Sequence, residues 1–385
     1  SKFGFDPDQL EAVLRELTRH PWAQLTGLHA HIGSQIFELQ PHHDLAGVLA
    51  DALALAGQRA NRWQFDILRQ NAAAERVPME GWIQRDVAVD LFRRAGLDFD
   101  ALKVQARSRD FRPVALPGAT FSGMFDVATS QITTKNVLAR LPGATRPDET
   151  ILYTAHWDHI GKDETKAGDQ IYNGAMDNAS GTAGILEIAR QLADKAKQGH
   201  GLARSVTFIA TTGEEQGLLG SRYYAANPLY PIDKTVAVLN LDSTNIYGKT
   251  KDFTIVGKGK SELETYLIDA AKQQNRIAMG EKNPASGGFF RSDHFSFAKL
   301  GVPMVYFEGG DDLVTGGKAA AKAAAEDYEK NRYHAPGDEF DEKWDWSGVM
   351  SDLKLYYRVG RMLAMTDAWP NWNDGDEFRA VRDKS

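Results

Sequence analysis

Two histidines and a carboxylate follow a short apolar run in the stretch 152–161 of this chain. The run from Ile151 to Ala155 has the length and the composition of a buried strand. Side chains alternate along a strand, so His156 and Asp158 are expected on the same face at its end. This spacing suits a pair of metal ligands, although a His-x-Asp pair taken by itself could equally be a satisfied polar pair.

Acidic residues follow other predicted elements in a similar manner. They are Glu214 and Glu215 after the run 206–211, Asp242 after the run 236–241, and Asp177 in a loop before a predicted helix. In open sheets of parallel strands, ligands bind at the carboxyl ends of the strands. Considered singly, Asp177 could be a helix N-cap and the others could be turn residues. Their coincidence at one sheet edge indicates a functional site instead.

The composition is that of a globular protein and excludes several classes. The 385 residues include 42% hydrophobic and 25% charged residues, enough for one large core and one or two smaller modules. The net charge of −7, without a long Lys/Arg run, argues against nucleic acid or an anionic membrane as the main partner. No apolar run reaches the roughly 18 residues that span a bilayer. Because the chain has no cysteine, any metal must be held by His, Asp or Glu.

From about residue 133, predicted strands alternate with predicted helices. This order predicts an α/β fold in which a mostly parallel sheet is flanked by helices on both faces. The expected strands are 136–141, 151–155, 205–211, 235–241, 302–307 and an edge strand over 253–256. The expected helices are 182–197, 218–226, 261–274 and 347–365.

The earlier part of the chain predicts a smaller, partial N-terminal region. We expect helices over 5–20, 45–56 and 85–95, the last ending at Gly96, and strands over 25–32 and 63–68, with a further short run over 77–83. The chain begins at Ser1 and shows no signal peptide, so its location stays open.

The motif His29-Ala-His31-Ile-Gly33-Ser34 and its flanks resemble the barrel of diaminopimelate decarboxylases and related pyridoxal phosphate enzymes. The resemblance covers about residues 1–57, and in that family the motif lies against the cofactor. The lysine that holds the cofactor belongs upstream of this segment, and the family's later cysteine motif cannot occur in a chain without cysteine. We therefore expect no working pyridoxal phosphate site.

Residues 58–130 resemble the later half of a protease-associated domain, a module inserted in larger metallo-aminopeptidases. The decarboxylase-like segment stands where the first half of that domain should be, so we interpret the join near residues 57–62 as a fusion boundary. The sequence thus predicts four parts, which are 1–57, 58–130, 131–372 and a C-terminal tail over 373–385.

An ordered set of motifs resembles the M28 family of co-catalytic zinc aminopeptidases over about residues 131–372, and the protease-associated remnant extends the resemblance to about residue 60. The motifs are His156-x-Asp158, Asp177-Asn178, Glu214-Glu215, Asp242, Arg291-Ser-Asp-His294 and Tyr333-His334. The flanks match as well, including Asn178-Ala-Ser-Gly181 after Asp177.

The resemblance implies a centre of two zinc ions per chain. His156 and Asp242 would hold one ion, Glu215 and His334 would hold the other, and Asp177 would bridge them. Imidazole and carboxylate ligands suit zinc. Two Zn²⁺ against three carboxylates leave a net positive centre, which favours hydroxide over water.

The same resemblance implies hydrolysis of the N-terminal bond of peptide substrates with a free N-terminus. Glu214 would be the general acid/base, and Asp158 would orient His156. Some family members help to hold the oxyanion with a tyrosine before the Arg-Ser-Asp-His motif. Here Phe289 and Phe290 occupy that neighbourhood, so the second oxyanion donor is not identified.

Several interpretations stay open beside the aminopeptidase. The aromatic residues that could form a substrate pocket or pack in the core are Trp157, Phe289, Phe290 and Tyr306.

The chain could instead be a non-catalytic binding protein on the same fold, a glutaminyl cyclase on the same fold, or a pyridoxal phosphate decarboxylase. The complete ligand set and the protease-associated remnant favour the zinc aminopeptidase.

Overall fold

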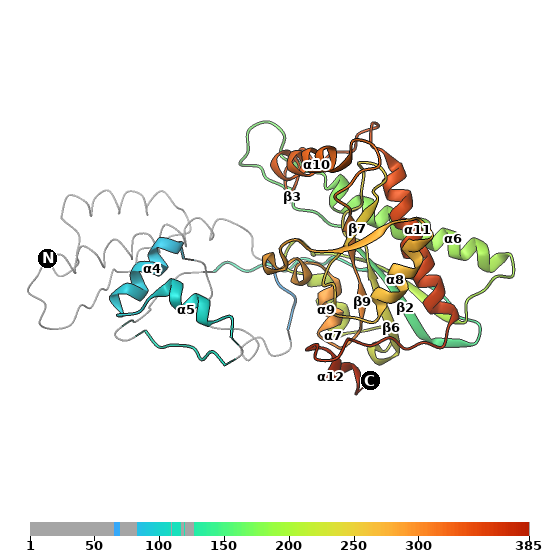
Figure 1. Cartoon of the computed structure of the whole chain (residues 1–385), viewed down its shortest axis with the longest axis horizontal. Coiled ribbons are helices and arrows are strands. Elements are labelled where there is room, and N and C mark those ends of the chain that lie inside the picture. Colours follow the sequence, from blue (N-terminus) through green and yellow to red (C-terminus); the bar gives the residue numbers. More distant parts are fainter. Residues whose placement is uncertain (1–64, 70–82, 109, 117–118, 120–126, 385) are drawn as a thin grey trace, which may run out of the picture. The chain divides into compact units, whose positions relative to one another are not determined.

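The computed structural model describes residues 65–69, 83–108, 110–116, 119 and 127–384. The chain divides into two compact units, residues 1–132 and 133–385 (Figure 1). The elements expected over 5–20, 25–32 and 45–56, and the run 77–83 except its last residue, lie outside the described residues.

The described part of the first unit contains two helices, α4 (Arg85–Arg94) and α5 (Phe99–Gln105). The helix expected over 85–95 is confirmed, and Gly96 follows it with a φ of 73°. The sequence analysis does not predict α5, which is capped by Asp98 through a bond from the N–H of Ala101 at 2.9 Å. Residues 65–69 have no regular secondary structure, so the strand expected over 63–68 is wrong where it is described.

The main sheet of the second unit has five strands in the order β1-β5-β2-β6-β9. They are β1 (Val137–Leu141), β5 (Arg204–Thr211), β2 (Arg146–His156), β6 (Thr235–Asn240) and β9 (Met304–Val305). Four of them run parallel, whereas β1 pairs antiparallel with β5 at one edge. The predicted α/β fold with a mostly parallel mixed sheet is confirmed.

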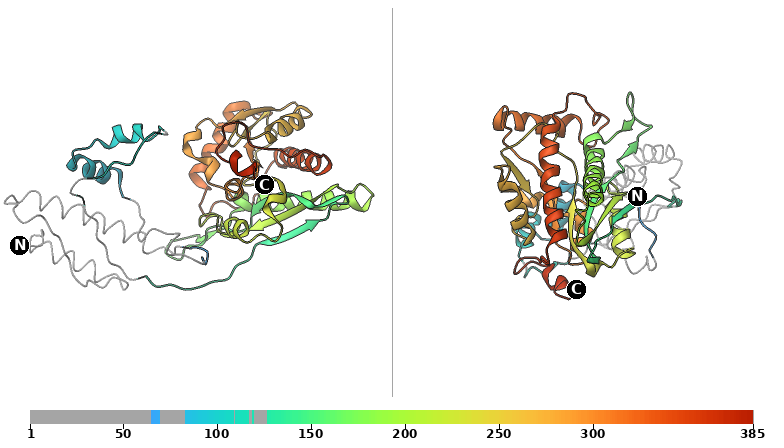
Figure 2. Two further views of the ribbon diagram at one scale, coloured as in Figure 1. Left: turned by 90° about the horizontal axis from the view of Figure 1, so that it is seen from below. Right: turned by 90° about the vertical axis from the view of Figure 1, so that its right-hand side faces the viewer.

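Helices cover both faces of this sheet because its central strands bury side chains on both faces. Tyr153 of β2 belongs to a core with α6 (Gly181–Lys197), α8 (Leu263–Lys272) and α11 (Trp346–Met365). Its neighbour Leu152 belongs to a second core with α7 (Leu219–Ala226) and the short α9 (His294–Ala298). α6 and α11 lie side by side (Figure 2). All of these helices except α9 are predicted by the sequence.

A second sheet has the order β10-β7-β8. Its strands are β10 (Phe307–Gly309), β7 (Asp252–Ile255) and β8 (Ile277–Gly280). The expected edge position of the strand over 253–256 is wrong, since β7 is the central strand of this separate sheet. The strand expected over 302–307 is divided between β9 and β10, which pair in different sheets. Apolar periodicity alone does not show where a chain passes from one sheet to another.

This unit also contains four short helical turns, Ala175–Ser180, Ile232–Lys234, Pro284–Ser286 and Gly288–Phe290, and several short or exposed elements. The latter are the hairpin of β3 (Gly161–Lys162) and β4 (Ile171–Tyr172), α10 (Gly317–Asn331) and α12 (Arg379–Arg382). α10 has no buried residue, which explains why no apolar stripe predicts it. Within the described residues, no helix combines the length and the apolar character that crossing a membrane requires.

The contact between α11 and β2 predicts that Gly360→Ala destabilises the second unit. A Cβ at Gly360 would overlap the hydroxyl of Tyr153. That hydroxyl donates to the carbonyl of Tyr356 at 2.7 Å, and the ring stacks on Phe208, so the tyrosine has no room to move. Overpacking of this kind costs about 1–3 kcal/mol of unfolding free energy.

Chemical denaturation of the full chain measures this loss. Gly201→Ala is the matched control, because a Cβ there meets no atom within 4 Å, and its effect should stay within about 0.5 kcal/mol. Equal transitions for Gly360→Ala and the wild type would show that α11 can shift away from β2 without cost.

Candidate metal centre

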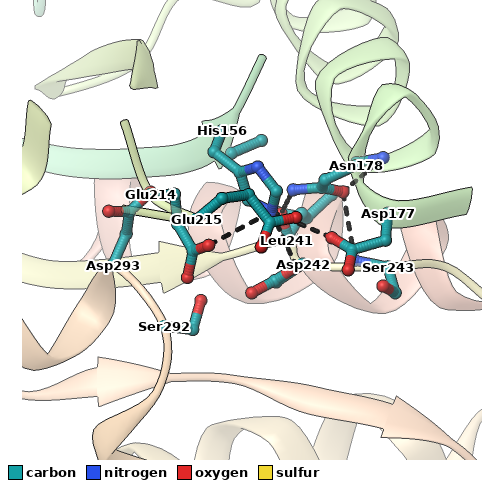
Figure 3. A network of polar contacts seen from close by, with 12 residues as sticks. His156, Asp177, Asn178, Glu214, Glu215, Leu241, Asp242, Ser243, Ser292 and Asp293 are labelled. Atoms are coloured by element: carbon teal, nitrogen blue, oxygen red, sulfur yellow. Dashed lines mark hydrogen bonds and ion pairs between the residues drawn. The ribbon is translucent and has the colours of Figure 1, made fainter. Parts of the chain in front are cut away.

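Three adjacent parallel strands deliver predicted site residues to one edge of the main sheet. His156 is the last residue of β2, Glu214 and Glu215 follow β5, and Asp242 follows β6 by two residues. Asp177 lies in the segment that precedes α6. The structure brings all five side chains together at the carboxyl edge of the sheet (Figure 3).

His156 lies among three carboxylates. Its Nε2 is 3.1 Å from Oδ1 of Asp177, 3.1 Å from Oδ1 of Asp242 and 3.9 Å from Oε2 of Glu214. Burial alone would lower the pKa of His156, but Asp242 and Asp177 raise it well above its usual value. The neighbouring carboxylates therefore favour the protonated form of the imidazole.

His334 forms a second group with two carboxylates. It lies in the turn after α10, and its Nε2 is 3.1 Å from Oε2 of Glu215 and 3.4 Å from Oδ2 of Asp177. Burial alone would lower the pKa of His334, but its contacts with Asp177 and Glu215 raise it to about 9. The side chain of His334 is 37% exposed, so this group is the more open of the two.

Asp177 belongs to both groups. It presents Oδ1 to His156 and Oδ2 to His334. Although burial alone would raise the pKa of Asp177, the two histidines hold it well below its usual range. The alternative role as a helix N-cap does not hold, since α6 begins only at Gly181 and Ser180 precedes it directly.

The residue after Asp177 ties this segment to the end of β6. Asn178 donates from Nδ2 to the carbonyl of Leu241 at 2.9 Å, and its Oδ1 accepts the N–H groups of Ser243 at 3.0 Å and Gly181 at 2.9 Å (Figure 3). A Cβ at Gly181 would overlap the Asn178 side chain. Only a glycine at this position permits the close approach.

Glu214 and Glu215 point to different partners although they are neighbours. Glu215 contacts His334 and also lies 2.6 Å from Nδ1 of His159, and these histidines lower its pKa although burial alone would raise it. Glu214 faces His156 instead, and burial raises the pKa of Glu214 well above its usual value, with a further contribution from Asp242. A glutamate with a raised pKa is suited to accepting and returning a proton near neutral pH.

Asp158 contacts His156 through its backbone. The carbonyl oxygen of Asp158 is 3.0 Å from Nδ1 of His156, whereas its carboxylate is 4.0 Å away and accepts the N–H of Glu214 at 3.3 Å. The carbonyl fixes the ring so that Nε2 faces the carboxylates. The orienting contact is therefore made by a different part of Asp158 than the resemblance implies.

Two further residues of this neighbourhood, His159 and Asp293, have no role that the sequence predicts. His159 lies against Glu215 and makes an edge contact with the ring of His334 at 5.7 Å. Asp293, in the Arg-Ser-Asp-His motif, accepts the hydroxyl of Thr211, and burial raises its pKa to about 6. His159 lies three residues beyond the strand end, where strand alternation no longer indicates direction.

The four aromatic pocket candidates divide into two pairs. Phe289 and Tyr306 are buried, and the hydroxyl of Tyr306 donates to the carbonyl of Asp242 at 3.3 Å. Trp157 and Phe290 are 50% and 48% exposed. Only the second pair is free to contact a substrate side chain, so Phe289 and Tyr306 are packing residues.

The donor set fits divalent zinc. Within the described residues, the ion pairs of Asp177, Glu214, Glu215 and Asp242 are all with histidines, and none is with Lys or Arg. This excess of buried negative charge favours a cation. The nitrogen–oxygen distances of 3.1–3.4 Å also match the roughly 3.3 Å that separates donors around a tetrahedral zinc.

The parallel sheet and these two groups define an α/β protein with a candidate metal centre at its carboxyl edge. The family model of Peptidase family M28 matches residues 136–357, and the chain belongs to that family. Residues 1–58 match the pyridoxal binding domain of pyridoxal-dependent decarboxylases, which confirms the resemblance of the first segment.

Curated relatives resemble separate parts of the chain. A diaminopimelate decarboxylase from Synechocystis sp. is 65% identical over 49 residues, or 13% of this chain and 10% of that protein. A probable zinc metalloprotease from Pyrenophora tritici-repentis is 32% identical over 156 residues, or 40% and 31%. A probable leucine aminopeptidase from Arthroderma otae is 31% identical over 182 residues, or 46% and 47%. The chain thus spans less than half the length of these relatives.

Among solved structures, a zinc aminopeptidase from Bacillus subtilis resembles this chain with a TM-score of 0.45 and 21% identity, covering 63% of this chain and 53% of that one.

The raised pKa of His334 predicts a pH-dependent contribution to the stability of the metal-free protein. A group whose folded pKa lies above its unfolded value of 6.5 stabilises the fold fully below pH 6.5, and this contribution is lost as the pH rises through about 9. We expect His334→Gln to lower the unfolding temperature at pH 6 and to have a diminishing effect up to pH 9.5.

Thermal unfolding of chelator-treated protein between pH 6 and pH 9.5 checks this. His200→Gln is the control, because His200 is exposed in the turn after α6. A gap between His334→Gln and the wild type that stays constant with pH would contradict the assignment of the shift to Asp177 and Glu215.

Proposed function

We propose that this chain is a zinc-dependent aminopeptidase that hydrolyses the N-terminal bond of peptides at a centre of two zinc ions. The observation that carries the proposal is the shared carboxylate of Asp177, whose two oxygens face His156 and His334 separately. Membership of Peptidase family M28 and the similarity to a probable leucine aminopeptidase support it.

The two groups of side chains give each ion its own ligands. His156 and Asp242 would hold the first ion, Glu215 and His334 would hold the second, and Asp177 would bridge them. When bound, the pair of ions would polarise the scissile carbonyl and lower the pKa of the attacking water.

Glu214 performs the proton transfers in this proposal. It is buried, and it lies close enough to His156 and Asp242 to be a third ligand. Its oxygen is 3.9 Å from Nε2 of His156, however, whereas Asp177 and Asp242 lie at 3.1 Å, so we assign those two as ligands and Glu214 to proton transfer. Its carboxylate accepts a proton from the attacking water as the oxygen–carbon bond forms, and returns that proton to the leaving amine as the carbon–nitrogen bond breaks. The raised pKa of Glu214 suits both transfers.

The alternatives have less support. A binding protein has no need of a buried glutamate beside a complete ligand set. A glutaminyl cyclase resembles a version of the site with one zinc, whereas two groups sharing Asp177 suit a pair of ions. A pyridoxal phosphate decarboxylase would need far more of its barrel than the matched residues 1–58.

Two substitutions separate metal binding from proton transfer. We expect about two zinc ions per chain in the wild type, as in dinuclear hydrolases. Asp177→Ala should lose both zinc and activity because it removes the shared ligand. Glu214→Gln should keep both ions and lower kcat by about 10²–10⁴-fold, because the amide cannot accept the proton.

Elemental analysis, run beside the hydrolysis of a panel of aminoacyl-anilides, measures both outcomes. Zinc loss in Glu214→Gln would move this residue from proton transfer to the ligand set. A wild type that binds no zinc and shows no turnover after zinc addition would support the binding protein instead.

We also propose that residues 131–372 form the catalytic part and that residues 1–57 are incidental to it. Deletion of residues 1–57 should leave kcat/KM for the preferred anilide within about twofold, because none of the proposed ligands lies there. The comparison requires that the circular dichroism of the second unit is unchanged. Loss of turnover in a folded deletion variant would assign a function to this segment.

A further inference from the structure

Asp338 is a buried carboxylate to which the proposed chemistry gives no task. It lies four residues after His334, in the turn that follows α10, and is 1% exposed. Within the described residues it forms no ion pair with Lys, Arg or His, so hydrogen bonds alone satisfy its charge. A buried carboxylate is costly unless its partners are well placed, which makes those partners informative.

Three successive backbone amides point at this residue. The N–H of Met176 donates to Oδ1 of Asp338 at 3.0 Å, and the N–H of Asp177 donates to Oδ2 at 3.0 Å. The N–H of Ala175 donates to the backbone carbonyl of Asp338 at 3.0 Å. The hydroxyl of Tyr328, near the end of α10, adds a bond to Oδ2 at 3.4 Å. Successive amides of this kind form a cradle for an anion.

These bonds join segments that are 161 residues apart in the chain. One segment carries Asp177 and the other carries His334. On its other side, the Asp177 segment is bound through Asn178 to the chain around Asp242. The segment that carries the Asp177 carboxylate is therefore hydrogen-bonded on both sides, through Asp338 to the turn with His334 and through Asn178 to the chain beside Asp242.

We propose that Asp338 is a positioning residue that sets the Asp177 carboxylate relative to His334 and so determines the affinity of the second metal position. The inference rests on the proposed function for its two zinc ions. The charged carboxylate is required because it offers an acceptor oxygen to each of two amides. An asparagine would keep one acceptor oxygen and replace the other with an N–H₂ donor. That donor would face the N–H of Met176, which lies 3.0 and 3.2 Å from the two oxygens of Asp338, or the N–H of Asp177.

Asp338→Asn should therefore weaken the second zinc selectively. We expect an affinity loss of about 10–100-fold for the ion held by Glu215 and His334, the size typical of residues that orient metal ligands. The first ion should change by less than about threefold, because Asn178 still fixes the segment on the side of Asp242. Titration of the metal-free full chain with zinc against a chromogenic chelator resolves the two affinities.

Two further variants complete the design. Tyr328→Phe removes only the weakest bond to Asp338 and keeps the ring, so it should give a smaller loss of the same kind and serves if Asp338→Asn does not fold. Glu339→Gln is the control at the neighbouring exposed carboxylate, which accepts a bond from Asn173 at 3.3 Å, and it should leave both affinities unchanged. A merely structural role for Asp338 would lower the unfolding temperature and leave zinc affinity in the folded protein as it is.

Amide hydrogen exchange on the zinc-free protein tests the contact independently of metal binding. Faster exchange over 174–178 in Asp338→Asn supports the inference, and unchanged exchange overturns it. Equal weakening of both ions, or two wild-type affinities, also overturns it. A wild type that binds no zinc defeats the proposed function, and the exchange result then still decides whether Asp338 holds the Asp177 segment.

Discussion

The site depends on keeping several carboxylates close together, and no Lys or Arg of the described part of the chain pairs with them. Asp177, Glu215 and Asp242 lie around two imidazoles at distances of 3.1–3.4 Å. Like charges repel strongly where water is excluded, so a flexible chain would separate them. In the metal-free site the imidazoles offset this repulsion, and a bound divalent cation would take over that role, which would couple metal binding to the stability of this edge of the sheet.

The scaffold keeps the carboxylates in place by holding the ends of the strands that carry them. The hydroxyl of Thr182 in α6 donates to the carbonyl of His156 at 2.8 Å, which holds the last residue of β2. Asn240, the last residue of β6, is held from two directions. Its Oδ1 accepts the hydroxyl of Thr154 at 2.6 Å, and its carbonyl accepts the hydroxyl of Tyr356 in α11 at 2.6 Å. The helices thus determine where the carboxylates lie as well as covering the sheet.

The part of the fold that the sequence predicts is the part governed by local pattern. Buried strands such as β5 and β6 are rich in apolar and β-branched residues, and α6 has a clear apolar stripe, so the sequence predicts all three elements. The position of β7 in a second sheet depends on pairing with distant segments. No local pattern records such pairing, and the same holds for α10, which buries no residue.

The candidate site divides in the same way. Strand ends in a parallel sheet predict that His156, Glu214 and Asp242 come together. His334 lies in a turn, where composition gives no direction, and only the family resemblance indicates it. Asp338 and His159 act through contacts that span 161 and 56 residues, and such contacts are visible only in the folded chain.

The two halves of the centre are formed by different kinds of backbone structure, and they differ in how accessible they are to solvent. The first half is formed by strand ends, and the side chain of His156 is 1% exposed. The second half depends on a turn, and the side chain of His334 is 37% exposed. In the proposed mechanism, water and the leaving amine would therefore exchange on the more exposed side, at His334, while the strand ends position the other side. With two ions bound, as proposed, such a centre would keep its geometry on the side of His156 and its access on the side of His334, and Asp177 is the side chain that the two groups share.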